Sequence, residues 1–447
     1  MLTAIKHCQS AIQQAAYYLL KQPPVLEQTQ EDVYFDVDDI WRRHDEIPTR
    51  ITIALDEVSP SRRLVLYNAL VFRRHEILTV LVSTPHVEVF DPDGNPMMAQ
   101  VSPVVSGEKR LGFAANKFQL SFPVVVEPLA LTTYTVSLRD SMAINKYTSY
   151  SRVRIYNADY WSVDLPKMFP IDQPSARLAE DVTVRAGNGT RVVATKEGLI
   201  KAIVSSDGTT MPVHMDFVQY DTQKGPDHNS GAYLFIPSGP ALPFKSDAYP
   251  EIVITEGTYK SSLYTGLNGP KAAEIVLALN VYNNPWNADG EVEVVNTMLV
   301  DPLVDDIELA MRFSTNVRNG DVFYTDLNGM QMIKRRFMDK LPLQANFYPL
   351  PSAAFIQDDS ARFTVLTATP LGVAALQPGQ IEIMQDRRLS RDDNRGLNQG
   401  VLDNVRTRHA FRILVERAQA PCQKPSPQYP SGHLSLGAHI SSQSLLQ

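Results

Sequence analysis

The residues best suited to chemistry lie in one dense polar run, residues 385–396, which brings Asp and Arg side chains together near Asp386, Arg387 and Arg388. The run follows residues 380–384, whose alternation is typical of a strand. A strand that leads Asp and Arg into a turn can tie down a loop by ion pairs, or it can present carboxylate and guanidinium to sugar hydroxyls. Composition alone favours the loop-ordering role, because most ion pairs in loops only order the loop.

Other chemically active residue types are scattered along the chain. The nine histidines form no His-x-His, His-x-Asp or His-x-x-Glu-His cluster, so no local metal site is predicted. Cys8 and Cys422 are too few for a disulfide framework or a metal knuckle, and pairing between them stays open. The sequence also lacks a Gly-x-Ser-x-Gly elbow, a phosphate-binding loop and a dinucleotide fingerprint. It therefore predicts no catalytic residue and no metal ligand in this chain.

Composition indicates a globular protein. The 447 residues are 44% hydrophobic and 20% charged, and the net charge is -7. Without a basic stripe, this charge argues against a nucleic-acid partner. The sequence contains no run of about 20 apolar residues, so no membrane span is predicted. Its first residues lack the apolar core of a signal peptide. One N-glycosylation acceptor is present, Asn188, in the sequence Asn-Gly-Thr.

The elements that must position these residues are mainly strands. Ile5, Cys8, Ile12, Ala15 and Leu19 form one helical stripe, which predicts a single helix that ends before two prolines. After an aperiodic linker over residues 25–48, apolar residues alternate with polar ones, as in 87–90, 291–294 and 307–313, which predicts strands with one buried face. Turn signals separate them without intervening helices, so we expect antiparallel β-sandwiches.

The predicted domains are therefore a helix over residues 1–24, a linker over 25–48, a small β-sandwich over 49–145 and a large β-domain over 146–418. Beyond them, residues 419–447 are rich in Pro, Ser, Gln and His with little periodicity. Such a composition predicts a disordered tail.

Several longer motifs resemble glycoside hydrolase family 38, in particular its α-mannosidase II-like members. The motifs occur in the family's order and extend the resemblance from residue 1 to about 418. They are residues 11–20 (Ala-Ile-Gln-Gln-Ala-Ala-Tyr-Tyr-Leu-Leu), 230–237 (Ser-Gly-Ala-Tyr-Leu-Phe-Ile-Pro), 323–329 (Phe-Tyr-Thr-Asp-Leu-Asn-Gly), 340–349 (Lys-Leu-Pro-Leu-Gln-Ala-Asn-Phe-Tyr-Pro) and the polar run from Asp386 to Gly396.

The resemblance implies a fold and an activity. The fold is a galactose mutarotase-like supersandwich behind a small sandwich, with residues 1–24 as the last helix of a middle helical bundle. The activity is zinc-dependent, retaining hydrolysis that trims α-mannose from N-glycans in the Golgi lumen, by enzymes that can be homodimers. The resemblance also implies two substrate-binding residues, Tyr233 and Arg388. We expect their side chains to be exposed and to approach each other.

The sequence departs from the family pattern at both ends. The zinc-binding His-x-Asp-Pro-Gly-Trp motif, the two catalytic Asp contexts and a later His-His-Asp motif do not occur, and the tail stands where the family has a closing β-region. We therefore expect a portion of such an enzyme, without zinc and inactive alone. The alternatives are a non-catalytic carbohydrate-binding or scaffold protein and a separate mutarotase-like sugar enzyme. The latter would need a His and a Glu that converge in a groove, and no motif points to them.

Overall fold

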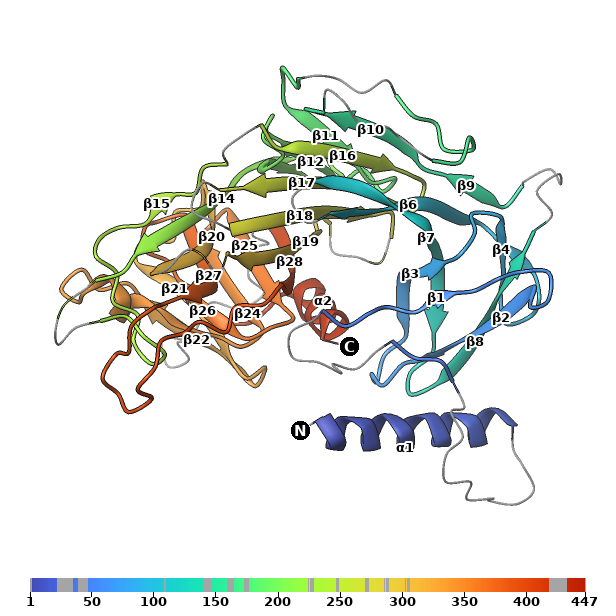
Figure 1. Cartoon of the computed structure of the whole chain (residues 1–447), viewed down its shortest axis with the longest axis horizontal. Helices are drawn as coiled ribbons and strands as arrows, with labels where there is room; N and C mark the ends of the chain where they lie inside the picture. Colours follow the sequence, from blue (N-terminus) through green and yellow to red (C-terminus); the bar gives the residue numbers. More distant parts are fainter. Residues whose placement is uncertain are drawn as a thin grey trace. The chain divides into compact units, whose positions relative to one another are not determined.

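The computed structural model describes residues 2–21, 35–38, 47–107, 110–139, 146–158, 165–172, 177–223, 225, 229–246, 249–269, 273–284, 286, 289–301, 303, 306–417 and 432–446. The chain divides into two compact units. The first consists of Met1–Val104 and Ala114–Tyr150, and the second of Val105–Phe113 and Ser151–Gln447. Strands dominate both units (Figure 1), which confirms the predicted mainly β class. Cys422 and most of the predicted linker lie outside the described residues.

The first unit begins with the predicted helix, α1 (Leu2–Lys21). Its apolar stripe is open to solvent in the structure, since Ile12 is 57% and Leu19 69% exposed. The thiol of Cys8 is free and exposed.

Two small sheets follow α1. One has the order β1 (Thr52–Ile53), β3 (Arg74–Val82), β7 (Leu111–Val126), β6 (Ala99–Gly107) and β9 (Thr148–Tyr150), and the other β2 (Ser61–Tyr67), β8 (Leu131–Leu138), β4 (Val87–Phe90) and β5 (Pro96–Met97). The alternation predicted at residues 87–90 holds, because Val87 and Val89 are fully buried and their neighbours are not.

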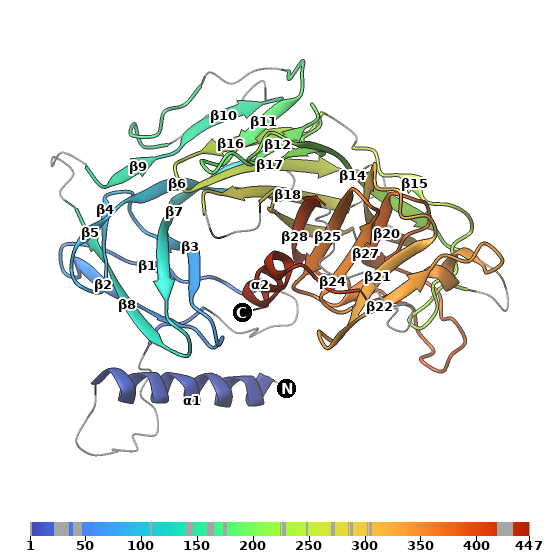
Figure 2. The same cartoon turned by 180° about the vertical axis from the view of Figure 1, so that it is seen from behind.

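Two large sheets make up the second unit, and Figure 2 shows them from behind. The ten-stranded sheet has the order β10 (Arg152–Tyr156), β16 (Glu251–Glu256), β17 (Lys260–Asn268), β18 (Ala273–Tyr282), β19 (Val292–Val300), β28 (Thr407–Arg417), β25 (Ala361–Thr367), β24 (Ala353–Gln357), β21 (Val322–Leu327) and β22 (Gln331–Arg336).

The nine-stranded sheet has the order β11 (Val182–Arg185), β12 (Arg191–Ala194), β13 (Ile200–Val204), β14 (Thr210–Asp221), β20 (Ile307–Thr315), β27 (Gln380–Arg388), β26 (Leu371–Ala374) and β23 (Tyr348–Leu350), with β15 (Leu242–Pro243) paired to β14. A short 3-10 helix, η1 (Leu343–Asn346), precedes β23.

One apolar core joins the inner faces of the two large sheets. Met215 and Phe217 from β14 and Met311 and Phe313 from β20 belong to it, as does Phe363 from the other sheet. The ring centroids of Phe313 and Phe363 are 5.4 Å apart. This arrangement confirms the prediction of a large antiparallel β-sandwich.

The outer face of the nine-stranded sheet is also covered, which the sequence did not predict. Ile307, Leu309, Met311 and Phe313 face the core as expected, yet Glu308 and Ala310 on the opposite face of β20 are also fully buried. Tyr220 and Val218 of β14 are buried beside Ala310, and Phe235 and Ala241 from the segment after β14 pack against them. This second buried face is where the candidate site lies.

The tail contains a helix, α2 (Leu436–Leu445), where the sequence predicted disorder. The Ser435 side chain caps it by accepting a hydrogen bond from the Ala438 backbone N–H at 3.0 Å. Ala438 is fully buried against Leu366 and Leu414 on the side of β25 and β28 that faces away from the main core. The prediction of disorder is therefore wrong over α2, while residues 418–431 lie outside the described part.

The packing of α2 can be tested with two substitutions in the same helix. Ala438→Asp would place a carboxylate at a site with no exposed surface, at a cost of about 3 kcal/mol, so we expect α2 to detach and its backbone amides to exchange with deuterium faster. Leu436→Asp, at a position that is 76% exposed, is the matched control and should leave the α2 amides protected from exchange, because acidic residues are favourable in a first helical turn. Equal protection of both variants would show that α2 is not held by this contact.

Candidate functional site

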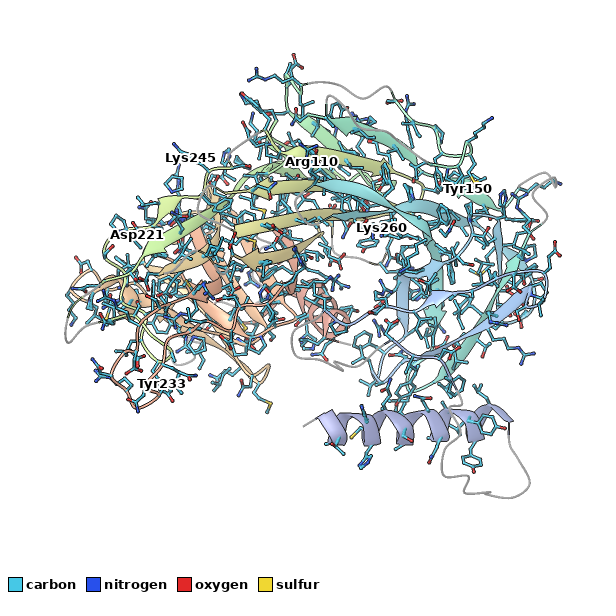
Figure 3. The ribbon with its side chains drawn as sticks, in the orientation of Figure 1. Arg110, Tyr150, Asp221, Tyr233, Lys245 and Lys260 are labelled. Atoms are coloured by element: carbon cyan, nitrogen blue, oxygen red, sulfur yellow. The ribbon has the colours of Figure 1, made fainter. Side chains whose placement is uncertain are left out.

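Tyr233 lies on the loop between β14 and β15, and its side chain is open to solvent (Figure 3). The residue is 64% exposed, so the expected exposure of its phenol is confirmed. Its backbone is nevertheless fixed. The N–H groups of Tyr233 and Leu234 donate to Oδ2 of Asp393, at 2.7 and 3.0 Å. A buried carboxylate from the polar run therefore holds the loop that presents the phenol.

The loop closes on itself through Ser230. The Ile236 N–H donates to the Ser230 hydroxyl at 2.7 Å, and that hydroxyl donates to the Ile236 carbonyl at 3.1 Å. Gly231 lies directly against Asp393, because a Cβ at this position would be 2.6 Å from the Asp393 Cβ. The close approach requires glycine, which explains why the motif has Gly beside Ser230.

Arg387 also holds this loop. Its Nη2 donates to the Leu234 carbonyl at 2.8 Å and lies 3.1 Å from Glu308, which is fully buried on β20. Burial raises the pKa of Glu308, and the charge of Arg387 opposes that rise. The ion pair compensates a carboxylate that would otherwise be isolated below the loop.

A register shift decides which arginine faces the loop. Arg387 pairs with Glu308 and Arg388 with Ile307, while the pairing of β20 with β27 shifts between Leu309 and Ala310. Since directly paired residues share a face of a sheet, Arg387 lies on the outer face with Glu308, and Arg388 lies on the face of Ile307. Such a bulge re-aims the side chains that follow it.

The structure therefore contradicts the expected exposure of Arg388. This residue is only 8% exposed. Its Nη1 donates to the Leu402 carbonyl at 3.1 Å and to Oδ1 of Asn404 at 3.3 Å. The Asn404 amide in turn donates to Oδ1 of Asp386 at 3.2 Å. Arg388 thus joins the polar run to the segment before β28, whereas Tyr233 is held by Arg387 and Asp393.

Sequence reasoning missed Arg387 and Asp393 as the residues that hold the Tyr233 loop. Both were visible within the polar run, but nothing in the sequence indicated the bulge that turns Arg387 outward. Several buried polar atoms of this run have no hydrogen-bond partner among the described residues: Asp386 Oδ2, Arg387 Nε, Asp392 Oδ1 and Asp393 Oδ1. Buried polar atoms are normally satisfied, so such a cluster marks a place where water or a ligand completes the hydrogen bonding.

The remaining predicted features lie elsewhere. Asn188 occupies the turn between β11 and β12, half-buried, and its Oδ1 accepts a hydrogen bond from the Thr190 N–H at 3.0 Å. Within the described residues, no group of three or more His, Cys, Asp or Glu side chains could hold a metal ion. In the same part of the chain, no helix is both long and apolar enough to cross a membrane.

Comparison with known proteins connects this site to a family. Residues 187–395, which include the Tyr233 loop and the polar run, match the model of the glycosyl hydrolases family 38 C-terminal domain. These residues are a family 38 C-terminal domain. The predicted resemblance to the C-terminal portion of an α-mannosidase II is thereby confirmed, and relatives extend it beyond the domain.

Alpha-mannosidase 2 of Drosophila melanogaster is 38% identical over 456 residues, which cover 100% of this chain and 39% of that protein. Alpha-mannosidase 2 of Homo sapiens is 33% identical over 428 residues, or 95% of this chain and 35% of that protein. A solved structure described as a protein in the glycosyl hydrolase family 38 from Enterococcus faecalis has a TM-score of 0.52 and 13% identity, and the match covers 80% of this chain and 44% of that one. This last likeness shows a common fold.

The hold on the Tyr233 loop can be tested at Asp393. Asp393→Ala removes the acceptor of two backbone N–H groups and should lower the local stability of the loop by about 2 kcal/mol. Hydrogen exchange at the Tyr233 and Leu234 amides should then become roughly 30-fold faster. Asp403→Ala, at an exposed acidic position of the neighbouring segment, is the control and should leave both amides unchanged. Unaltered exchange in the Asp393 variant would mean that other contacts hold the loop.

Proposed function

We propose that this chain is the β-rich part of an α-mannosidase that trims α-mannose from N-glycans, and that Tyr233 contacts the sugar. The observation that supports this most directly is the exposed phenol on a loop that Asp393 and Arg387 hold from below. A hydroxyl on a rigid loop can form a directed hydrogen bond with a sugar at little entropic cost. The chain spans less than two fifths of the α-mannosidases that it matches, so the activity is proposed for the larger protein.

Hydrolysis of an α-mannoside with retention needs two carboxyl groups on either side of the glycosidic bond. We assign neither to this chain, whose role is to bind and orient the sugar. Arg388 enters the proposal as a second substrate-binding residue at the edge of the site. Because it is 8% exposed and bonded to Leu402 and Asn404, a ligand could touch only a small part of its guanidinium.

The zinc implied by the family resemblance does not fit the residues described here, since they contain no group that could hold a metal. The proposal therefore derives no step through zinc on this chain. The same proposal includes a location in the Golgi lumen, a mannose-containing N-glycan as the substrate, and self-association into dimers. They rest on likeness to proteins named alpha-mannosidase 2.

A chimera tests the function directly. This chain should replace the matched segment of Drosophila melanogaster alpha-mannosidase 2 with retention of activity on an aryl α-mannoside. In the chimera, Tyr233→Phe should lower kcat/KM about tenfold, because one hydrogen bond to the sugar is lost. The melting temperature should stay unchanged. Tyr67→Phe, at a tyrosine of β2 that is 52% exposed, is the control and should be silent.

The outcomes separate the alternatives. A folded but inactive chimera would favour a carbohydrate-binding or scaffold protein without catalysis. Full activity of the Tyr233→Phe chimera would remove Tyr233 from the sugar site. Turnover by the isolated chain would show that the catalytic groups lie within it, contrary to the proposal.

A secretory-pathway location also predicts modification at Asn188, which we propose as a glycosylation site. The chain made in insect or mammalian secretory cells should lose the mass of one N-glycan in the variant Asn188→Gln. Thr190→Ser keeps the acceptor sequence and should keep the glycan. An identical intact mass for the parent chain before and after peptide N-glycosidase treatment would contradict the proposal.

A further inference from the structure

A pocket of about 460 Å³ lies on the outer face of the nine-stranded sheet. Its volume falls in the range of small-molecule sites. Arg312 of β20 lines it from the sheet, and Ala241 lines it from the segment between Tyr233 and β15. In Figure 3, Asp221 and Lys245 mark the two ends of the segment that carries Tyr233 and Ala241. Neither Tyr233 nor Arg388 lines the pocket.

The base of the pocket is a buried polar triad. The Tyr220 hydroxyl donates to Oε1 of Glu382, Arg312 Nε donates to Oε2 of Glu382 at 2.7 Å, and Arg312 Nη2 forms an ion pair with the same oxygen at 2.6 Å. Tyr220 and Glu382 are fully buried. Burying the carboxylate of Glu382 beside a half-buried arginine is costly, and apolar residues would stabilise a sheet at least as well. A triad of this kind below an open pocket therefore indicates a binding role.

The charges of the triad cancel, so the pocket is electrically neutral. Burial raises the pKa of Tyr220, which keeps the phenol protonated as a donor to Glu382. Arg312 is the one charged residue among those that line the pocket, and Glu382 compensates it. An anion would meet a guanidinium whose charge Glu382 already compensates, and a cation would meet no carboxylate among the described residues that line the pocket. A neutral ligand is therefore favoured.

The walls combine hydrogen-bonding groups with apolar surface. The planar guanidinium of Arg312 has more N–H donors than its bonds to Glu382 use, and Gln377 and Gln380 add amides that both donate and accept. Phe337, Leu341 and Leu343 supply the apolar side. A purely apolar ligand would desolvate the polar groups without replacing their bonds. A pyranose offers both hydroxyls and a C–H face that packs on aromatic and aliphatic side chains.

We propose that this pocket binds a hexopyranose unit of a glycan, at a site separate from Tyr233 and Arg388. The segment after β14 supplies both sites, because it carries Tyr233 to solvent and Ala241 to the pocket. Phe235 between them packs with its ring centroid 5.2 Å from that of Tyr220. The pocket does not depend on the proposed hydrolysis, and it would serve equally in a protein that only binds carbohydrate.

Binding by the whole 447-residue chain tests this inference. Saturation-transfer NMR and calorimetry with methyl α-mannoside, methyl β-galactoside and methyl N-acetyl-β-glucosaminide should detect at least one of them, with a Kd on the order of 1 mM. Ala241→Trp fills the pocket and should weaken binding more than tenfold. Gln377→Ala, at an exposed position where folding is not at risk, should weaken it about threefold to tenfold.

Two matched variants show where a sugar binds. Leu242→Trp adds the same bulky side chain one residue further along the chain, outside the pocket, and should leave the Kd unchanged. Tyr233→Ala, at the other proposed sugar site, should also leave the Kd unchanged. Loss of binding in Tyr233→Ala with full binding in Ala241→Trp would overturn the inference. So would the lack of any signal up to about 50 mM hexoside, or displacement of the sugar by inorganic phosphate, which would identify an anion site at Arg312. These outcomes are independent of the mannosidase chimera.

Discussion

Two ion pairs on the outer face of the nine-stranded sheet, Glu308 with Arg387 and Glu382 with Arg312, determine how this side of the large unit is built, and in each a buried glutamate meets a half-buried arginine. A carboxylate without surface exposure needs a partner in the folded state, or it would be neutral or the fold would be destabilised. Each arginine meets this requirement and contacts something further. Arg387 reaches the carbonyl of Leu234, and Arg312 lines a pocket. Pairing the buried charges thus fixes the loop of Tyr233 and the base of the pocket at once.

The bulge where β20 pairs with β27 is the geometric condition for this arrangement. In an uninterrupted strand, residues 382, 384, 386 and 388 would all face the same side, and Arg388 would accompany Glu382. The register shift instead places Arg387 on the outer face and turns Arg388 toward Leu402 and Asn404. Two adjacent arginines therefore hold two different segments. This difference explains how one short polar run can order both the Tyr233 loop and the approach to β28.

The tail helix α2 covers an apolar surface on the ten-stranded sheet. The central strands of the ten-stranded sheet carry apolar residues on both faces, and Phe355, Leu366 and Leu414 lie on the side away from the main core. Apolar surface of this kind is a liability for association if it is left open. Helix α2 covers it with a small residue, Ala438, and Arg412 donates to the Ser441 carbonyl at 3.1 Å. Cover by α2 accounts for order in a segment whose composition is typical of disorder.

The sequence by itself determined the strands, their turns and the family. The alternation at residues 87–90 and 307–313 follows from the two-residue period of a strand. Asn328 and Gly329 form the turn between β21 and β22, with positive φ at both residues. The long motifs around Tyr233 and the polar run indicated the family 38 C-terminal domain, and Tyr233 is exposed as expected. Only the tertiary structure decided that Arg387 and Asp393 hold the loop, that Arg388 is buried and that α2 is ordered. These outcomes depend on a bulge and on contacts between residues about 14 to 160 positions apart, and neither leaves a periodic signal in the sequence.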